Sequence, residues 1–358
     1  MFPIVHSADL HLGRNFLNQR YDYEMSQKRK ESLWNTFENI LSFSKNNHAT
    51  LLLCGDTFDH TPEVHEVIHF LNCTGKYPEV PVYIIEGNHD QGFVNKLEQL
   101  KGSQTQIHTF QTAELSFYEI DEIKVRIYGI KWNSNVVLSD ELKKNVLDSS
   151  YTNILMLHSS LEEKKDAYMP IHKKELLNYG YDYYALGHVH QPIALYENMI
   201  FSGSPEPLSF RETGKHGIIL GVIKKNKNKL DFIQMSKVEY VQKIIDLSEN
   251  MQIDQLDSII EKEINNYSKN HYLRIIFRGM VEKVLYDYIE KFQMNSHYKY
   301  AYLEFINNCQ IAFDYDLLKK LHENDIVGQF IKTVERDSFI NREEILALGL
   351  EALLREKI

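Results

Sequence analysis

The sequence predicts an α/β protein: a two-sheet sandwich flanked by helices, followed by a small α+β unit and a helical C-terminal tail. Short apolar, β-branched runs alternate with segments of helical periodicity, which is the pattern of parallel sheets with crossover helices. Two period-two runs, residues 114–120 and 124–130, indicate a hairpin in a second, stacked sheet. A chain of 358 residues, 43% of them hydrophobic, is long enough to build more than one core.

The elements of the first part follow from these periodicities in chain order. Buried strands are expected where apolar runs are short and bounded by glycine or polar residues. Helices are expected where apolar residues recur three and four positions apart. The expected strands include 51–54, 80–85, 154–157, 183–186, 199–201, 217–223 and 230–235, and the expected helices include 26–47, 62–72, 94–100, 139–148 and 173–179.

The pattern changes near residue 236, and we place domain boundaries at 1–236, 237–312 and 313–358. The middle segment reads as an α+β unit of its own, and the last segment has helical spacing throughout. Within the middle segment, strands are expected at 240–247, 271–277 and 300–305, and helices at 253–266 and 281–294.

The composition restricts the function classes. The net charge is −10, with 40 Lys and Arg against 50 Asp and Glu, which argues against tight non-specific DNA binding by this chain alone. The three cysteines match no zinc motif and no disulfide framework, which favours a reducing compartment. No signal peptide is recognised and no apolar run approaches the roughly 20 residues that span a bilayer. We therefore expect a cytoplasmic protein without a membrane anchor.

Residues of metal-ligand type follow five of the expected strands. In parallel sheets the carboxyl ends of the strands share one edge, where ligands bind. Carboxylate, amide and imidazole donors together suit borderline divalent metals, and so many donors fit two ions better than one. These residues are Asp9, His11, Asp56, Asn88, His89, His158, His188 and His190.

The spacing of these residues adds local detail. If the chain stays extended, Asp9 and His11 point to one face, as do His188 and His190. Asp56 has two carboxylate oxygens and is placed to bridge two metals, with the preceding glycine free to adopt an unusual backbone conformation.

With all five motifs considered together, the chain resembles the calcineurin-like metallophosphoesterases. Their pattern is D-x-H, G-D-x-x-D, G-N-H-D/E, H and G-H-x-H, and it occurs here in order within residues 5–190. The runs at 6–14 and 201–210 and the appended α+β unit resemble the SbcD and YhaO type of DNA-repair exonuclease subunit. The resemblance covers residues 1–235 well and the rest loosely.

This resemblance implies roles for individual residues. One metal would be held by Asp9, His11 and His190, the other by Asn88, His158 and His188, with Asp56 as the bridging carboxylate. His89 would assist catalysis without binding metal. Asp59 and Asp90 would not bind metal either but would orient the residues that do. The resemblance implies two divalent ions, of which Mn²⁺ is the usual choice.

The resemblance also implies partners. The substrate would be DNA, held by the capping unit 237–312, with Arg14, Arg274 and Arg278 as candidate DNA contacts. An SbcC-like ABC-type ATPase with a coiled coil would dock on the helical tail 313–358. A homodimer through helices near the N-terminal half is also implied, with 62–72 as the candidate segment.

Three functions compete at this stage. The first is a metal-dependent DNA exonuclease, with endonuclease activity as a further option, acting in DNA repair. The second is a phosphodiesterase or phosphatase that acts on a small nucleotide. Enzymes for small substrates rarely need the roughly 120 extra residues that follow the core here. The third is a scaffold that has lost its chemistry, and the complete ligand set argues against it.

Overall fold

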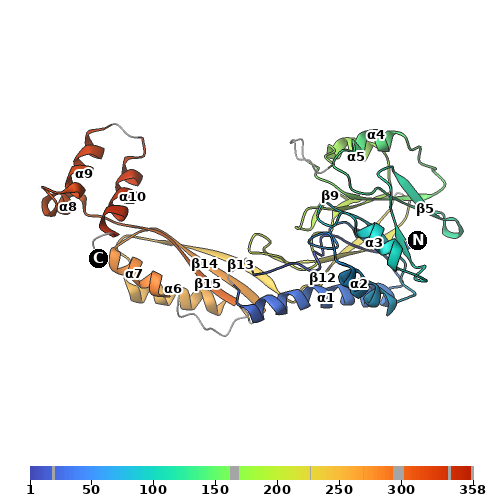
Figure 1. Ribbon diagram of the computed structural model, residues 1–358, viewed down its shortest axis with the longest axis horizontal. Helices are drawn as coiled ribbons and strands as arrows, with labels where there is room; N and C mark the ends of the chain where they lie inside the picture. Colours follow the sequence, from blue (N-terminus) through green and yellow to red (C-terminus); the bar gives the residue numbers. More distant parts are fainter. Residues whose placement is uncertain are drawn as a thin grey trace. The chain divides into compact units, whose positions relative to one another are not determined.

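The computed structural model of the chain describes residues 1–17, 21–161, 169–225, 227–268, 270–292, 302–337 and 340–355. The chain separates into two compact units, residues 1–239 and 240–358 (Figure 1). Among the described residues, no helix has the length and apolar character needed to cross a membrane.

The first unit contains two sheets, as the sequence predicted, and each has six strands. In the first sheet, four consecutive strands run parallel, and a hairpin extends the sheet beyond the N-terminal strand. The parallel strands are β1 (Phe2–Ser7), β2 (Thr50–Cys54), β3 (Val82–Ile85) and β4 (Ile107–Thr109), and the hairpin is β11 (Gly217–Ile223) with β12 (Lys229–Gln234). The helices after β1, β2 and β3 are α1 (Tyr23–Asn46), α2 (Val64–Gly75) and α3 (Phe93–Leu100).

The second sheet has the strand order β5-β6-β7-β8-β10-β9. The predicted hairpin forms its edge, because β5 pairs antiparallel with β6. Strands β6, β7, β8 and β10 then run parallel. These elements are β5 (Ser116–Ile120), η1 (Asp121–Ile123), β6 (Val125–Gly129), α4 (Leu138–Lys143), β7 (Thr152–His158), α5 (Lys173–Asn178), β8 (Tyr183–Gly187), β9 (Ile193–Tyr196) and β10 (Met199–Phe201).

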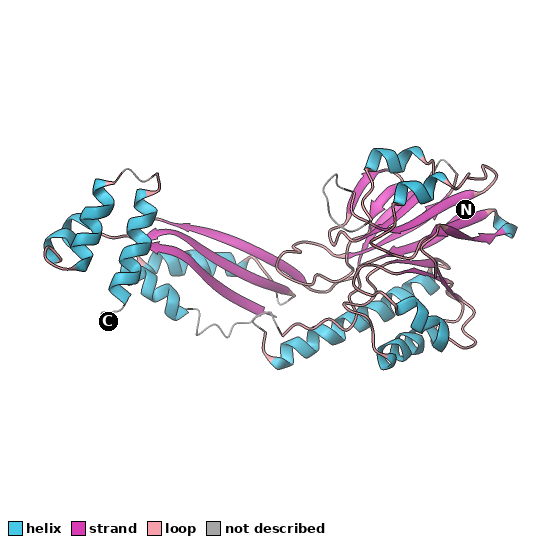
Figure 2. Cartoon of the chain, turned by 45° about the horizontal axis from the view of Figure 1, so that its top comes forward, coloured by secondary structure: helices cyan, strands magenta, loops and turns pink. Residues whose placement is uncertain are grey.

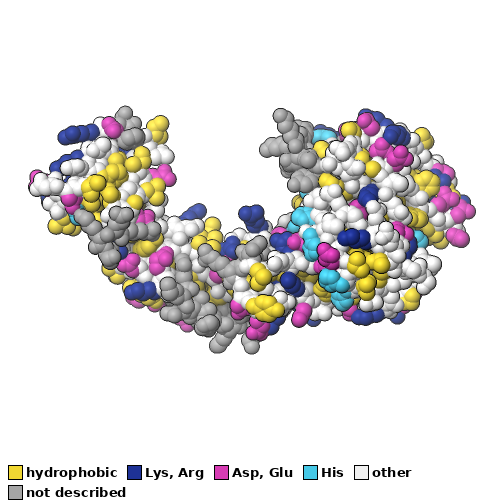
Figure 3. All heavy atoms as spheres, in the orientation of Figure 1, with side chains coloured by type: hydrophobic (Ala, Val, Ile, Leu, Met, Phe, Trp, Pro, Cys, Tyr) yellow, Lys and Arg dark blue, Asp and Glu magenta, His cyan; other side chains and the backbone are white. Residues whose placement is uncertain are grey.

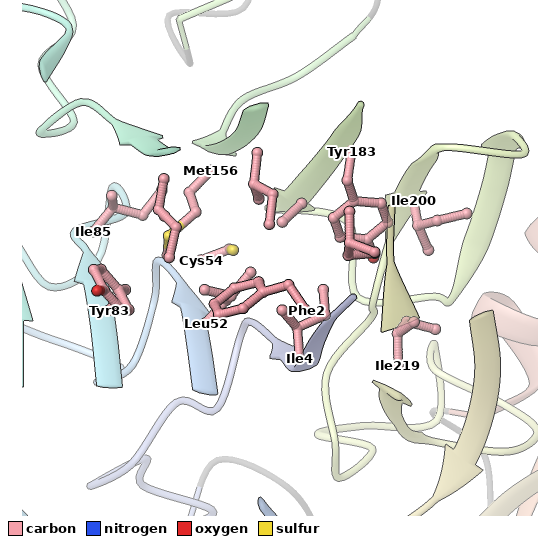
Figure 4. Close-up of a cluster of buried hydrophobic side chains, with 14 of the residues drawn as sticks. Phe2, Ile4, Leu52, Cys54, Tyr83, Ile85, Met156, Tyr183, Ile200 and Ile219 are labelled. Carbon is pink, nitrogen blue, oxygen red and sulfur yellow. The ribbon is translucent and has the colours of Figure 1, made fainter. Parts of the chain in front are cut away.

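The core of this unit lies between the two sheets (Figure 4). Leu52 and Cys54 from the first sheet meet Met156 and Tyr183 from the second, and all four are fully buried. Every residue of β2 is buried, because a parallel strand between two layers has no solvent face. This burial explains why β2 reads in the sequence as an uninterrupted apolar run.

Strand register brings the motif loops to one edge. Ser7 pairs with Leu53, Cys54 with Ile85, and His158 with Gly187, so neighbouring strands end at the same level. The residues of metal-ligand type therefore leave the two sheets beside one another.

The second unit begins with three long strands that form their own sheet (Figure 2). Helices α6 (Ile253–Asn265) and α7 (Lys283–Phe292) contribute to a hydrophobic cluster with β13 (Glu239–Leu247), β14 (His271–Val281) and β15 (Tyr302–Ile311). Residues 293–301, which include the expected start of the last strand, lie outside the described residues. Helices α8 (Tyr315–Leu321), α9 (Ile326–Arg336) and α10 (Arg342–Arg355) then pack on a small cluster of their own.

Candidate metal centre

The loop after β1 runs beside the loop after β2. Backbone hydrogen bonds join Asp9 N to Gly55 O at 3.0 Å and His11 N to Asp56 O at 3.0 Å. The chain does not stay extended through Asp9 and His11, because β1 ends at Ser7, so the condition under which both would point to one face is not met. Both residues instead have positive φ, 54° and 48°, as do Asp56 at 49° and His188 at 101°. These uncommon conformations in non-glycine residues are typical of functional sites.

Asp9, His11 and His190 form the first cluster of candidate ligands, with donor atoms within 4.8 Å of one another. The Nε2 atoms of His11 and His190 are 3.3 Å apart, and Nε2 of His190 is 3.9 Å from Oδ1 of Asp9. Asp9 is fully buried and accepts a bond from the backbone N–H of His188 at 3.0 Å. The cluster therefore joins the loop after β1 to the loop after β8.

Asp56 and His158 form the core of a second cluster, in which Asp9 also lies within reach. The Nε2 atom of His158 is 3.3 Å from Oδ2 of Asp56 and 3.1 Å from Oδ1 of Asn88. The same Oδ2 atom is 3.9 Å from Nε2 of His11. Asp56 thus lies between the two clusters, which is the position that a bridging carboxylate needs.

His188 lies next to this second cluster, with its ring centroid 5.3 Å from that of His158. Burial and the neighbouring His158 lower the pKa of His188 to about 4. A neutral imidazole is the form that binds metal.

In three of these histidines, the ring nitrogen outside the clusters donates a hydrogen bond to an acceptor. The Nδ1 atoms of His11, His158 and His190 donate to Asp59 Oδ1, Cys54 O and Glu212 Oε1, at 2.9, 3.0 and 2.9 Å. Metal-binding histidines commonly donate the N–H of their other ring nitrogen in this way. In the neutral rings the Nε2 lone pairs then point into the clusters.

The arrangement of these metal-ligand atoms shows whether divalent cations fit between them. The two opposed Nε2 lone pairs of His11 and His190 would repel each other at 3.3 Å, and a cation between them removes that repulsion. Burial lowers the pKa of His158, but Asp56 and Asp9 outweigh it and raise that pKa to about 9. The local field therefore favours positive charge, and the residues present fit two divalent cations.

Two glycines are required by close approach at this point. A Cβ on Gly87 would lie 2.1 Å from Oδ1 of Asp56, and a Cβ on Gly55 would lie 2.4 Å from Nδ1 of His158. Gly55 also has φ of +86°, which agrees with the expected unusual conformation.

Asp90 holds the loops after β2 and β3 together. It is fully buried and accepts bonds from the backbone N–H groups of Gly87 at 2.7 Å and Thr57 at 2.8 Å. Burial and the nearby charge of Asp56 raise the pKa of Asp90 to about 8. Its contacts are thus to the backbone that positions Asp56 and Asn88.

His89 lies at the exposed rim of the centre. Its backbone N–H donates to Oδ1 of Asp56 at 2.9 Å, and its Nδ1 lies 3.1 Å from the carbonyl oxygen of Asp59. His89 also forms a possible ligand group with His11 and Asp59. Figure 3 shows histidine side chains gathered on the surface of this unit.

The three candidate DNA contacts are all paired with carboxylates. Arg14 donates to Oδ1 of Asp59 at 2.9 Å, beside the metal centre. In the second unit, Arg274 is paired with Glu304 and Arg278 with Asp246.

Glu212 is the site residue that sequence reasoning missed. It stands between β10 and β11, in a segment without periodicity, and the family pattern does not include it. Its role becomes visible only when the fold places it beside His190.

The sequence of this chain is similar to those of known phosphoesterases. Residues 2–192 match the family described as calcineurin-like phosphoesterase. The chain is 26% identical over 299 residues to the uncharacterized metallophosphoesterase YhaO of Bacillus subtilis, a match covering 77% of this chain and 71% of that protein. It is 26% identical over 235 residues to the DNA double-strand break repair protein Mre11 of Methanopyrus kandleri, covering 58% of this chain and 50% of that protein.

The match to YhaO covers 77% of the chain. Residues 1–239 make up only about two thirds of the chain, so this match extends into the second unit.

Proposed function

Because the chain belongs to the calcineurin-like phosphoesterase family, we propose that it is a DNA nuclease that hydrolyses phosphodiester bonds with two divalent metal ions. The observation that carries this proposal is the position of Asp56 between two clusters of donors, 3.3 Å from His158 and 3.9 Å from His11. A single carboxylate shared by two sets of ligands is suited to two-metal hydrolysis.

The proposed ligands divide between two ions. Asp9, His11 and His190 would hold one, and Asn88, His158 and His188 the other, with Asp56 shared. Asp9 also lies within reach of the second cluster, so its two oxygens could serve either ion. When bound, the two ions would lower the pKa of a water molecule and neutralise charge on the phosphoryl oxygens.

His89 is proposed to act on the leaving group. Its Nδ1 faces the carbonyl oxygen of Asp59, which can only accept, so Nδ1 keeps its hydrogen. Nε2 is then the nitrogen left to act on the leaving group. In the protonated ring, Nε2–H can donate to the leaving oxygen or stabilise its developing charge.

DNA is the proposed substrate class for two reasons. One relative is described as a DNA double-strand break repair protein. The chain also has a compact second unit, residues 240–358, which a small substrate would not require. Because Arg274 and Arg278 are paired with carboxylates, contact with a phosphate would exchange one ion pair for another, and their contribution to affinity would be small.

The remaining parts of the proposal concern surroundings and partners. Mn²⁺ is the expected ion, and the cytoplasm is the expected location, where the three free cysteines would stay reduced. An SbcC-like ATPase is expected to bind the helical tail, where Leu317, Leu321 and Ile326 expose half or more of their surface. Figure 3 shows hydrophobic side chains at the surface of this segment. A homodimer through 62–72 is proposed on the exposed Val64 and Ile68 of α2.

Metal content tests the proposed centre directly. Protein stripped with EDTA should bind two Mn²⁺ per chain in titration calorimetry and hydrolyse bis-nitrophenyl phosphate only after Mn²⁺ is added. The Asp56→Asn variant should lose at least one ion and fall to background activity, because an amide has one weaker oxygen donor. Normal turnover in that variant would exclude Asp56 as the bridge.

A further inference from the structure

Glu212 makes contacts on both of its carboxylate oxygens. Oε1 accepts from Nδ1 of His190 at 2.9 Å. Oε2 accepts from the backbone N–H of Leu208 at 2.8 Å and from the hydroxyl of Ser204 at 3.3 Å. The side chain is only 13% exposed, so these contacts are largely shielded from water.

These contacts determine which nitrogen of His190 carries the hydrogen. A carboxylate only accepts, so Nδ1 must be the donor, and Nε2 presents its lone pair to Asp9 and His11. The same arrangement occurs at His11 with Asp59 and at His158 with the carbonyl of Cys54. The hydrogen bond also fixes the ring orientation.

The segment that carries Glu212 is anchored from two sides. Glu206, which is fully buried, pairs with Arg29 at 3.0 Å and accepts from the hydroxyl of Thr36 at 2.8 Å, so the segment is tied to α1. On the other side, the carbonyl oxygen of His190 accepts from the backbone N–H of Ser204 at 2.9 Å. Glu212 therefore approaches His190 from a held position.

We infer that Glu212 is a positioning residue for metal binding: it orients His190 and keeps it in the Nδ1–H form, and so strengthens one of the two metal sites. This inference rests on the proposed metal centre. It predicts an asymmetry, because Glu212 contacts His190, which belongs to the first cluster, whereas Asn88, His158 and His188 belong to the second.

Titration calorimetry with Mn²⁺ on the full chain tests this asymmetry. The Glu212→Leu variant, which lacks an acceptor, should weaken one of the two sites by about 10–100-fold and change the other by less than about threefold. Glu212→Gln should recover most of the lost affinity, because its amide oxygen can accept from Nδ1 of His190.

Ser204→Ala serves as the matched control. It removes the hydroxyl contacts to Glu212, to His216 and to the carbonyl oxygen of His190, but leaves the bond between Glu212 and the His190 ring and the backbone bond from Ser204 N–H to His190. If Glu212 acts through His190, both Mn²⁺ affinities in this variant should stay near wild type. An equal loss in Ser204→Ala and Glu212→Leu would show that general loosening of the segment is responsible and would overturn the inference.

A spectroscopic readout requires no variant. In ¹⁵N-labelled wild-type protein loaded with diamagnetic Zn²⁺, the His190 imidazole should show its hydrogen on Nδ1. A hydrogen on Nε2, or Glu212→Leu protein with both Mn²⁺ affinities unchanged, would overturn the inference while leaving the metal centre intact. Wild-type protein that binds no Mn²⁺ would overturn the metal centre and the inference together.

Discussion

His89 could serve as a metal ligand or as an acid for the leaving group, and its contacts favour the second role. It lies beside Asp56 and Asn88 through its backbone, yet its side chain is exposed and its Nδ1 faces a carbonyl oxygen. The proposed ligand sets are complete without it. We therefore treat it as an acid for the leaving group.

The His89→Ala variant should keep both Mn²⁺ ions and lose nuclease activity by about 10²–10⁴-fold, the usual contribution of a positioned acid or base. Elemental analysis of the loaded variant and a DNA cleavage assay measure the two properties. Loss of an ion in the variant would identify His89 as a ligand, as its grouping with His11 and Asp59 also permits.

His6 is a buried histidine that links the two sheets. Its Nε2 lies 3.2 Å from the carbonyl oxygen of Leu186, which can only accept, and its Nδ1 lies 2.9 Å from the hydroxyl of Tyr183. Burial lowers the pKa of His6 to about 3, despite the opposing effect of the Leu186 carbonyl. The ring is therefore neutral in the folded protein.

This shift predicts a pH dependence of stability. Below the ordinary pKa of about 6.5 the unfolded chain takes up a proton at His6 and the folded chain does not. The free energy of unfolding should therefore fall as the pH drops from 6.5 toward 3. Between pH 6.5 and 5, the free energy of unfolding of His6→Gln should fall by about 1.7 kcal/mol less than that of wild type, measured by urea unfolding of metal-free protein. Parallel pH profiles for the two proteins would contradict the account.

At the scale of single residues, the sequence was informative where chemistry and spacing coincide. The ligand types from Asp9 to His190 could be recognised because their motifs are local. Glu212 could not, because its contact with His190 depends on two segments meeting in the fold. The positive φ of Asp9 and His11 was also beyond a pattern that assumes an extended chain.

Among the elements, α1 depends on a buried ion pair. Arg29 is 1% exposed, pairs with Glu206 at 3.0 Å and donates to the carbonyl oxygen of Pro207 at 2.7 Å. Its guanidinium also lies 5.4 Å from the ring centre of Phe16. Removing the cation alone would leave Glu206 charged and buried without its partner.

Arg29→Met should consequently lower the free energy of unfolding by about 3–5 kcal/mol, the usual cost of breaking a buried pair from one side. The double variant with Glu206→Gln should recover much of this loss, since the remaining amide can still accept from Thr36. Urea unfolding of the two variants and wild type provides the comparison. A double variant as unstable as the single one would show that lost packing around Arg29, rather than the unpaired carboxylate, sets the cost.

The boundaries of elements were less predictable than their existence. Helix α1 begins at Tyr23 and not at residue 26, because the side chain of Asp22 accepts from the backbone N–H of Met25 at 2.7 Å. Strand β14 continues to Val281, past the apolar run that suggested an end at residue 277, because it stays paired with β15 up to Ile311. Tertiary pairing extends this strand through a stretch of mixed polarity.

For the molecule as a whole, the two-sheet α/β fold could be predicted because the buried strands of the two sheets appear in the sequence as separate short apolar runs. The role of the second unit could not, because a cap or a docking surface depends on molecules outside this chain. The helical tail illustrates this limit. Leu346 and Leu350 of α10 pack against Val327 and Ile331 of α9, so the tail needs α10 for its own core.

Point substitutions therefore test docking better than deletion of the last helix would. Leu317 and Leu321 are 50% and 69% exposed on α8. The double variant Leu317→Glu and Leu321→Glu should lose co-purification with a co-expressed SbcC-like ATPase and keep Mn²⁺-dependent hydrolysis of bis-nitrophenyl phosphate. Ile123→Glu, at a residue 51% exposed in the first unit, is the matched control and should still co-purify. Retention of the ATPase by the double variant would place its binding surface elsewhere.

The proposed nuclease activity is tested most directly by comparing substrates with purified, Mn²⁺-loaded protein. Linear duplex, hairpin and single-stranded DNA, a cyclic nucleotide and bis-nitrophenyl phosphate are offered at equal phosphodiester concentration, with Asp56→Asn protein as the control for contaminating nuclease. We expect cleavage of at least one DNA substrate and of bis-nitrophenyl phosphate, no activity in EDTA, and none in the control. Hydrolysis of the cyclic nucleotide with all DNA left intact would contradict the proposed nuclease and favour a small-nucleotide phosphodiesterase.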